Sequence, residues 1–161
     1  MKKIKIAEPH NNKHLEMIEQ FEQQNNIESI IIKNLKNIRD NLTKEEYEKL
    51  QQTSNEIQQI LFIEKDEIIK DYCYIQVEKD RRICHLMPAP LKTRNKNQSI
   101  LSQVTNYAFE VLGMNDIFIT TSKNMEHETL EREGFTNIGE NEGKTIFIKQ
   151  REDQVEYNKT I

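Results

Sequence analysis

Two cations stand just before a strongly helical segment, at a position that suits the binding of an anion. Arg94 and Lys96 lie in a polar stretch, residues 92–99, and Ser99 or Asn97 is the expected N-cap of the following helix. Free backbone N–H groups and the positive end of a helix dipole favour negative charge at such a start, phosphate above all. A solvated loop with an ordinary helix cap fits the same residues, so this stretch alone leaves both interpretations open.

The apolar run before this loop carries two groups that could take part in chemistry. His85 has an imidazole, whose ordinary pKa suits the acceptance of a proton from an ammonium group near neutral pH. A half-exposed strand histidine without a role is the alternative. Cys84 is better interpreted as a small core residue than as a nucleophile, because nothing nearby completes a convincing set of cysteine, histidine and acid.

Two tyrosines and two further histidines are also candidates. Tyr72 and Tyr74 share one face of a predicted strand and would line an acceptor pocket, although cross-strand packing also explains such a pair. His10 and His14 have the i, i+4 spacing of metal ligands. They straddle a predicted helix start and no third ligand is in view, so no metal site is assigned.

A strand, a loop, a helix and a second strand position the main candidates. Residues 83–90 and 116–121 predict strands, and residues 100–112 predict an amphipathic helix between them. Its buried face is expected to hold Ile100, Leu101, Val104, Tyr107, Ala108, Val111 and Leu112. Gly113 follows, where a left-handed C-terminal cap is expected. The unit is a βαβ motif, whose strands should be parallel.

The remaining patterns predict helices before this unit and a meander leading into it. The N-terminal half is expected to contain a strand at 2–7 with Ile4 and Ile6 facing inward, helices at 12–24 and 27–42, and a helix opened by the capping box Thr43-Lys44-Glu45-Glu46. Residues 51–59 fit either a loop or a helix end. The other expected elements are strands at 60–63, 68–77 and 82–87, a helix at 123–133, and a hairpin at 135–139 and 145–149.

This element order predicts an α/β (α+β) fold with a mixed, mostly antiparallel sheet of six to seven strands, flanked by helices, around a central βαβ unit. Residues 1–150 form one domain in this interpretation, and residues 151–161 form a polar tail. The chain has 161 residues, which is enough for one buried core.

Composition narrows the class of protein. The net charge of −4 argues against a nucleic-acid binder that works by bulk electrostatics. No apolar run approaches the roughly 18 residues of a membrane span. Cys73 and Cys84 lie in apolar runs, and no signal-like leader is seen, so we expect reduced core thiols and a cytoplasmic location.

Residues 93–99 resemble the pyrophosphate loop of the GNAT N-acetyltransferase superfamily, which reads Arg/Gln-x-x-Gly-x-Gly/Ala. Arg94 matches the first position, whereas Asn97 and Ser99 stand where glycines are usual. Asparagine is the non-glycine residue that best tolerates left-handed backbone angles. Residues 106–114 are similar to a helix end in the ribosomal-protein acetyltransferase branch, and residues 130–135 are similar to the family's Leu/Tyr-Glu-Lys-x-Gly-Phe.

The resemblance implies acetyl-CoA as co-substrate. It implies that the pyrophosphate is cradled by the loop residues Arg94, Asn95, Lys96, Asn97, Gln98 and Ser99. Leu86 and Met87 would face the pantetheine arm and the thioester carbonyl through their backbone, with an N–H there as the oxyanion donor. Asn124 resembles the family asparagine that reaches the pantetheine arm.

The proton-transfer groups depart from the family pattern. Many members have a carboxylate on the strand before the loop, where this chain has Cys84 and His85. The family often has a tyrosine four residues before the signature glycine, where it protonates the leaving thiolate. Leu130 occupies that position. His85 and Tyr72 are therefore the catalytic candidates that the sequence offers.

Three functional hypotheses follow. The first is an N-acetyltransferase that moves an acetyl group from acetyl-CoA to a primary amine of unknown identity, with no nucleic-acid or membrane partner and with a homodimer left open. The second is a catalytically silent domain that binds acyl-CoA or a protein, and the third is the fold without a cofactor. The acceptor pocket is expected from residues 25–58 and the strand face around Tyr72.

Overall fold

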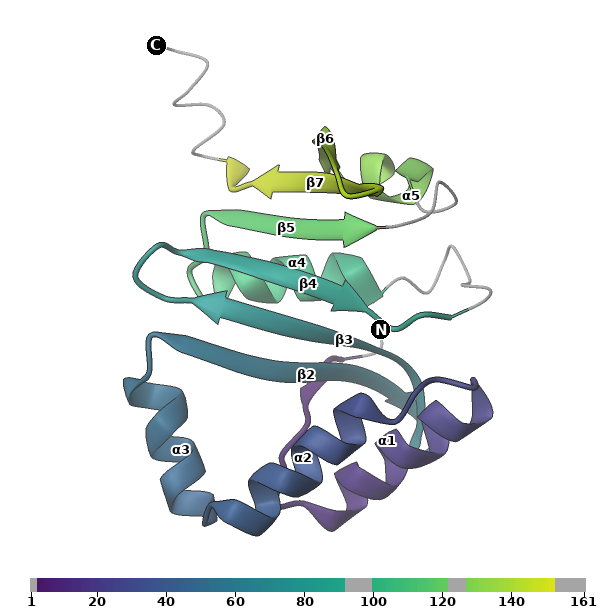
Figure 1. Cartoon of the computed structure of the whole chain (residues 1–161), viewed down its shortest axis with the longest axis vertical. Coiled ribbons are helices and arrows are strands. Elements are labelled where there is room, and N and C mark those ends of the chain that lie inside the picture. Colours follow the sequence, from purple (N-terminus) through teal and green to yellow (C-terminus); the bar gives the residue numbers. More distant parts are fainter. Residues whose placement is uncertain (1–2, 92–99, 122–126, 153–161) are drawn as a thin grey trace.

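The computed structural model describes residues 3–91, 100–121 and 127–152, and its centre is a single sheet in the order β1-β2-β3-β4-β5-β7-β6 (Figure 1). The strands are β1 (Lys5–Ile6), β2 (Glu56–Lys65), β3 (Ile68–Glu78), β4 (Ile83–Pro88), β5 (Asp116–Thr121), β6 (Thr136–Asn141) and β7 (Lys144–Gln150). The helices are α1 (Asn12–Gln24), α2 (Ile30–Asn41), α3 (Lys44–Thr53), α4 (Ile100–Glu110) and α5 (His127–Arg132). Only β4 and β5 pair in parallel within this described sheet. The predicted fold class is confirmed.

Side chains on opposite faces of the sheet enter two separate apolar clusters. Cys73 and Ile75 point to the cluster beneath α4 and α5, whereas Tyr72, directly before Cys73, joins the cluster under α1 and α2. The two-residue alternation of β3 is confirmed by this division. Helices α1 and α2 lie over β2 and β3, and the same face of β4, β5 and β7 has no helix above it in the described structure (Figure 1).

The βαβ unit closes as predicted, with one correction. Gly113 has a φ of +71°, and the N–H of Met114 donates to the carbonyl of Ala108 at 3.0 Å, so the left-handed cap is confirmed. Val111 is 69% exposed, although its spacing predicted burial, because α4 ends at Glu110. The Arg151 guanidinium donates to the carbonyl of Met114, at the end of this unit.

The N-terminal helices follow their sequence signals, but the first strand does not. Helix α1 has the predicted bounds, and the capping box of α3 is complete, because Thr43 and Glu46 exchange side-chain and backbone hydrogen bonds. The predicted strand shrinks to β1, where Ile6 is 40% exposed instead of facing inward. This strand pairs only with Phe62 and Leu61, at the edge of the sheet.

Strand β2 is longer than predicted, since it begins at Glu56 and includes part of the polar stretch that fitted a loop or helix end. Gln58 pairs with Gln76, and Ile57 pairs with Val77. Ile57 is buried and Gln58 is exposed. The long ladder with β3 thus sets a strand where local propensity is weak.

The second half of the domain agrees with its pattern. Gly134 ends α5 with a φ of +94°, and β6 and β7 form the predicted hairpin. Residues 92–99, 122–126 and 153–161 lie outside the described residues, so the predictions for Arg94–Ser99, for Asn124 and for most of the tail concern unplaced parts of the chain. None of the helices in the described ranges is long and apolar enough to span a membrane.

Candidate functional site

The two parallel strands separate before they end. Their ladder runs from Ile83 opposite Asp116 to Leu86 opposite Ile119, and it stops there. Strand β4 continues to Pro88 alongside β3, and β5 continues to Thr121 alongside β7. A gap therefore opens between two neighbouring strands in the middle of the sheet. An extended ligand could enter this gap and find backbone groups on both sides.

The residues at the gap suit a long, partly apolar ligand. Leu86 is buried on the α4 side, and Met87 is 45% exposed on the opposite face. Pro88 brings a carbonyl but no N–H to the gap. Helix α4 starts at the same edge of the sheet as the end of β4 (Figure 1), so its free N–H groups and positive dipole end lie near the mouth.

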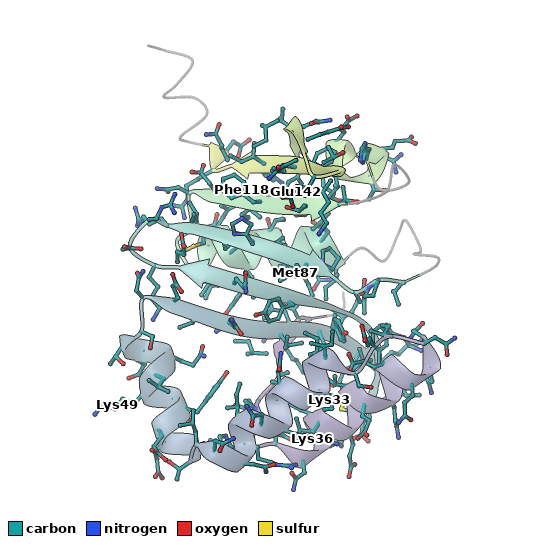
Figure 2. The ribbon with its side chains drawn as sticks, in the orientation of Figure 1. Lys33, Lys36, Lys49, Met87, Phe118 and Glu142 are labelled. Atoms are coloured by element: carbon teal, nitrogen blue, oxygen red, sulfur yellow. The ribbon has the colours of Figure 1, made fainter. Side chains whose placement is uncertain are left out.

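His85 lies on the open face of the sheet, in the last part of the parallel ladder. It pairs across β3 with Gln76 and across β5 with Phe118. Its ring stacks on the Phe118 ring, with centroids 5.2 Å apart and an interplanar angle of 23°. Figure 2 shows Phe118 and Met87 on this face. Stacking and register thus orient an exposed imidazole one residue before the gap opens.

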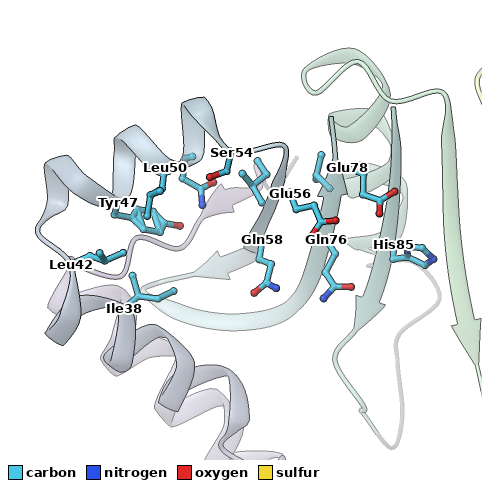
Figure 3. A pocket seen from close by; sticks show the side chains of 13 residues that line it. Ile38, Leu42, Tyr47, Leu50, Ser54, Glu56, Gln58, Gln76, Glu78 and His85 are labelled. Carbon is cyan, nitrogen blue, oxygen red and sulfur yellow. The ribbon is translucent and has the colours of Figure 1, made fainter. Parts of the chain in front are cut away.

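A cavity of about 400 Å³ extends from His85 toward α2 and α3 (Figure 3). Its floor is the row Gln58, Gln76 and His85 on three adjacent strands. Apolar side chains of the helices line its outer wall: Ile38, Leu42, Tyr47 and Leu50. Its charged residues are Glu56 and Glu78, which face each other across β2 and β3. His85 therefore lies between the cavity and the gap. The cavity includes Glu78, which pairs with Ile83 at the start of β4, and the gap opens toward the end of β4.

The expected place of Tyr72 in the acceptor pocket needs correction. Tyr72 is 2% exposed, and its hydroxyl donates to Glu22 Oε2 at 2.8 Å beneath α1. Desolvation is the main reason that the pKa of this phenol lies well above its usual range, and the hydrogen bond to Glu22 adds to it. Tyr74 lines a separate cavity of about 30 Å³. On this face of β3 it is therefore Gln76 that lines the cavity, and the Tyr72 hydroxyl is hydrogen-bonded to a buried carboxyl instead.

Glu22 is the buried partner of that hydroxyl. Desolvation raises the pKa of its carboxyl, and hydrogen bonds from Tyr72 and from the backbone of Ile32 act in the opposite direction. Ile32 lies in the first turn of α2, whose N-cap Ser29 makes no side-chain cap bond. Glu22 thus joins α1, the start of α2 and β3 inside one apolar cluster.

Cys84 and Leu130 both lie in the apolar cluster on the α4 side of the sheet. Cys84 is fully buried, and its burial raises the pKa of the thiol to about 12, so it is protonated at neutral pH. Leu130, at the position of the family tyrosine, is 2% exposed in the same core. Both residues contribute to packing.

The burial of Leu130 leads to a stability prediction. Leu130→Tyr should lower the free energy of unfolding by about 1–3 kcal/mol, because the larger ring overpacks the cluster and buries a hydroxyl. Chemical denaturation of the variant and the wild type measures this cost. Wild-type stability together with a gain in thioester turnover would show instead that the new hydroxyl reaches the reacting sulfur.

Sequence reasoning identified part of this site. It named His85, Leu86 and Met87, and the structure brings all three to the end of the parallel ladder. It included Gln58 only as the last residue of the range 25–58 and missed Phe118, and these two become neighbours of Gln76 and His85 only through the register of four strands. No local signal marks these two, because the pairings join residues far apart in the chain.

Solved structures with the same fold are N-acetyltransferases. Campylobacter jejuni PseH in complex with acetyl coenzyme A is 19% identical over 92% of this chain and 99% of that chain, with a TM-score of 0.59. Dodecameric spermidine N-acetyltransferase from Vibrio cholerae is 12% identical over 97% of each chain, with a TM-score of 0.60. Apo FdhC, a nucleotide-linked sugar GNAT, is 14% identical over 98% of this chain and 93% of that chain, with a TM-score of 0.63.

The similarity between this chain and these acetyltransferases was found by comparison of structures. No family model matches the chain. Comparison with curated protein sequences also found no match. The shared property is therefore the fold, with its parallel pair of strands inside a mostly antiparallel sheet.

Proposed function

Starting from the GNAT fold that this chain shares with known N-acetyltransferases, we propose that it transfers an acetyl group from acetyl-CoA to a primary amine. The observation that carries this proposal is the gap after Leu86 and Ile119, with His85 between it and a cavity on the open face. The ribosomal-protein acetyltransferase branch is proposed on the similarity of residues 106–114 and 130–135 alone.

The residues of the gap fit the co-substrate. Acetyl-CoA supplies an activated thioester when it is bound. In this proposal the backbone of Leu86 and Met87 would hold the pantetheine arm, and Asn124 is the counterpart of the asparagine that the resemblance assigns to the same arm. Residues Arg94–Ser99 precede α4 in the sequence and would hold the pyrophosphate, because two cations and a helix start favour an anion.

The cavity residues have separate tasks. Glu56 and Glu78 give the cavity a negative rim that attracts a protonated amine. His85 accepts a proton from the bound ammonium group before the attack, so the nitrogen reaches the thioester carbonyl neutral and with a free lone pair. Gln58 and Gln76 offer amide groups that can hydrogen-bond polar atoms of the acceptor. The described core offers no obvious acid for the leaving thiolate, whose ordinary pKa of about 8.5 lets it leave largely unprotonated.

A coenzyme-binding domain without turnover is the second candidate. The burial of Leu130 favours it, because the position of the usual proton donor is filled by a core side chain. Thioester cleavage measured against a broad panel of primary amines separates the two candidates. Turnover with any amine supports the transferase, and tight acetyl-CoA binding without turnover supports the silent domain.

Acetyl-CoA binding is the first expected result. With micromolar-range affinity, a ligand concentration of about 100 times Kd should stabilise the fold by about 2.7 kcal/mol. For a domain of this size that corresponds to a rise in melting temperature of roughly 5–10 °C. A thermal-shift titration measures it, and a flat curve to millimolar acetyl-CoA would remove the cofactor from the proposal.

A charge-matched pair of variants locates the binding site. Arg94→Ala combined with Lys96→Ala should reduce the thermal shift, and the loss should be larger at low salt, since ionic contacts to phosphate are screened by salt. Lys33→Ala combined with Lys49→Ala removes the same charge from exposed positions on α2 and α3 (Figure 2). Equal losses in both double variants would indicate net charge instead of a phosphate site.

A further inference from the structure

Tyr47 of α3 stands between three cavities on one side of the sheet. It lines the cavity of about 400 Å³ that contains His85, a second of about 250 Å³, and the small one of about 30 Å³ beside Tyr74. Among the described residues it is the only one that lines all three. Its ring thus forms part of the wall between these three cavities.

The second cavity has a polar lining that differs from that of the first. Apart from Tyr47, it is bounded by a loop and the start of α3: Glu8, Pro9, His10, Asn11, Lys44 and Glu48. The loop is held in place, because His10 Nε2 lies 2.7 Å from the carbonyl oxygen of Leu42. Two carboxylates and one ammonium group give this lining a formal charge of −1.

The position of Tyr47 is weakly held. Its ring meets the His10 ring at its edge, with centroids 6.1 Å apart, and it is half-buried. Helix α3 contains no fully buried residue, so no packed core locks the helix and its tyrosine in one arrangement. Burial and the nearby Glu8 carboxylate raise the pKa of the Tyr47 phenol, which is therefore neutral. The ring thus borders the first two cavities without a fully buried neighbour on its own helix.

We infer that the Tyr47 ring limits the length of amine that the site accepts, and that the second cavity, which the ring closes off, is complementary to the distal ammonium group of a linear diamine. This inference rests on the proposed function. One nitrogen lies at His85, the aliphatic chain runs along Ile38, Leu42 and Leu50, and the Tyr47 ring stops it. Beyond the ring, Glu8 and Glu48 would pair with a second ammonium group.

The test is a chain-length series of primary monoamines and α,ω-diamines, with wild type and Tyr47→Ala. In Tyr47→Ala the ratio of kcat/KM for long diamines to kcat/KM for short monoamines should rise by about tenfold or more, the usual worth of space for a methylene or two. Glu48→Gln in the Tyr47→Ala background should reduce the gain for diamines and leave the gain for long monoamines. An unchanged length preference in a folded Tyr47→Ala protein would overturn the inference.

Two further variants control for a folding defect and for a general effect of changing α3. Tyr47→Leu shortens the side chain but keeps an apolar contact, so it should shift the length preference in the same direction. It replaces Tyr47→Ala in the test if that variant folds poorly. Lys49→Ala, on the outer side of the same helix (Figure 2), should leave the length preference unchanged. An equal shift in Lys49→Ala would mean that any change to α3 alters the preference, which overturns the role of Tyr47.

Direct binding separates this inference from the transferase proposal. If the wild type turns over no amine, the proposed function fails, and calorimetry with a long diamine and no co-substrate still tests the cavity. Binding to Tyr47→Ala about tenfold tighter than to the wild type supports the limiting role of the Tyr47 ring. Equal binding to both proteins overturns it.

Discussion

Replacing His85 with glutamine is expected to lower kcat/KM for amine acetylation by about 10²- to 10⁴-fold, the usual contribution of a positioned general base. Glutamine keeps hydrogen-bonding ability at the end of the parallel ladder but cannot accept a proton from an ammonium group. Acetyl-CoA binding should stay within a few fold, because the gap is built from backbone. Steady-state kinetics and thermal shift measure the two quantities.

A second histidine makes this test specific. His127→Gln is the matched control, because His127 packs on Phe147 in the opposite half of the sheet and does not line the cavity. Activity of His85→Gln within a few fold of the wild type would mean that the base lies elsewhere.

Removing the Tyr72 hydroxyl is expected to destabilise the fold strongly, because it leaves a buried carboxyl without its donor. Tyr72→Phe should lower the free energy of unfolding by about 1.5–3 kcal/mol, because a fully buried carboxyl loses its hydroxyl donor. Urea denaturation at neutral pH measures the loss. Wild-type stability combined with a large fall in kcat would return Tyr72 to the list of catalytic candidates.

The free energy of unfolding should depend on pH through the ionisation of Glu22. Burial raises the pKa of its carboxyl above the ordinary value of 4.5, so the folded state holds the proton more tightly than the unfolded state does. Its contribution is therefore fully present below about pH 4.5 and is lost as pH rises through the folded-state pKa. Tyr72→Phe removes a bond that favours the charged form, so its destabilisation should be greater at neutral pH than at acidic pH.

Glu22→Gln is the companion variant. The neutral amide can still accept a hydrogen bond from Tyr72 and has no charge to desolvate. Relative to the wild type, this variant should gain stability as pH rises from about 4.5 to 7. Melting temperatures of both proteins across that range measure the difference, and parallel curves would show that Glu22 keeps the same ionisation state in the folded and unfolded chains.

Local patterns were sufficient for most of the elements. The three- and four-residue spacing in residues 100–110, the capping box at Thr43–Glu46 and the glycine after α4 each specify a helix or its end through bonds within a few residues. The alternation in β3 likewise separates Cys73 from Tyr72. Such signals depend on backbone geometry that neighbouring residues set among themselves, so they can be interpreted without the fold.

The position of each candidate side chain relative to the site depends on strand pairing between residues far apart in the chain. Tyr72 and Gln76 share a face of β3, yet α1 covers Tyr72 while Gln76 floors an open cavity, and no periodicity distinguishes the two. Strand β2 begins at Glu56 because β3 supplies its hydrogen bonds. The parallel ladder stops after Leu86 and Ile119, although β4 stays paired with β3 and β5 with β7 to their ends. Register and helix docking join residues far apart in the chain, and they bring His85 between gap and cavity.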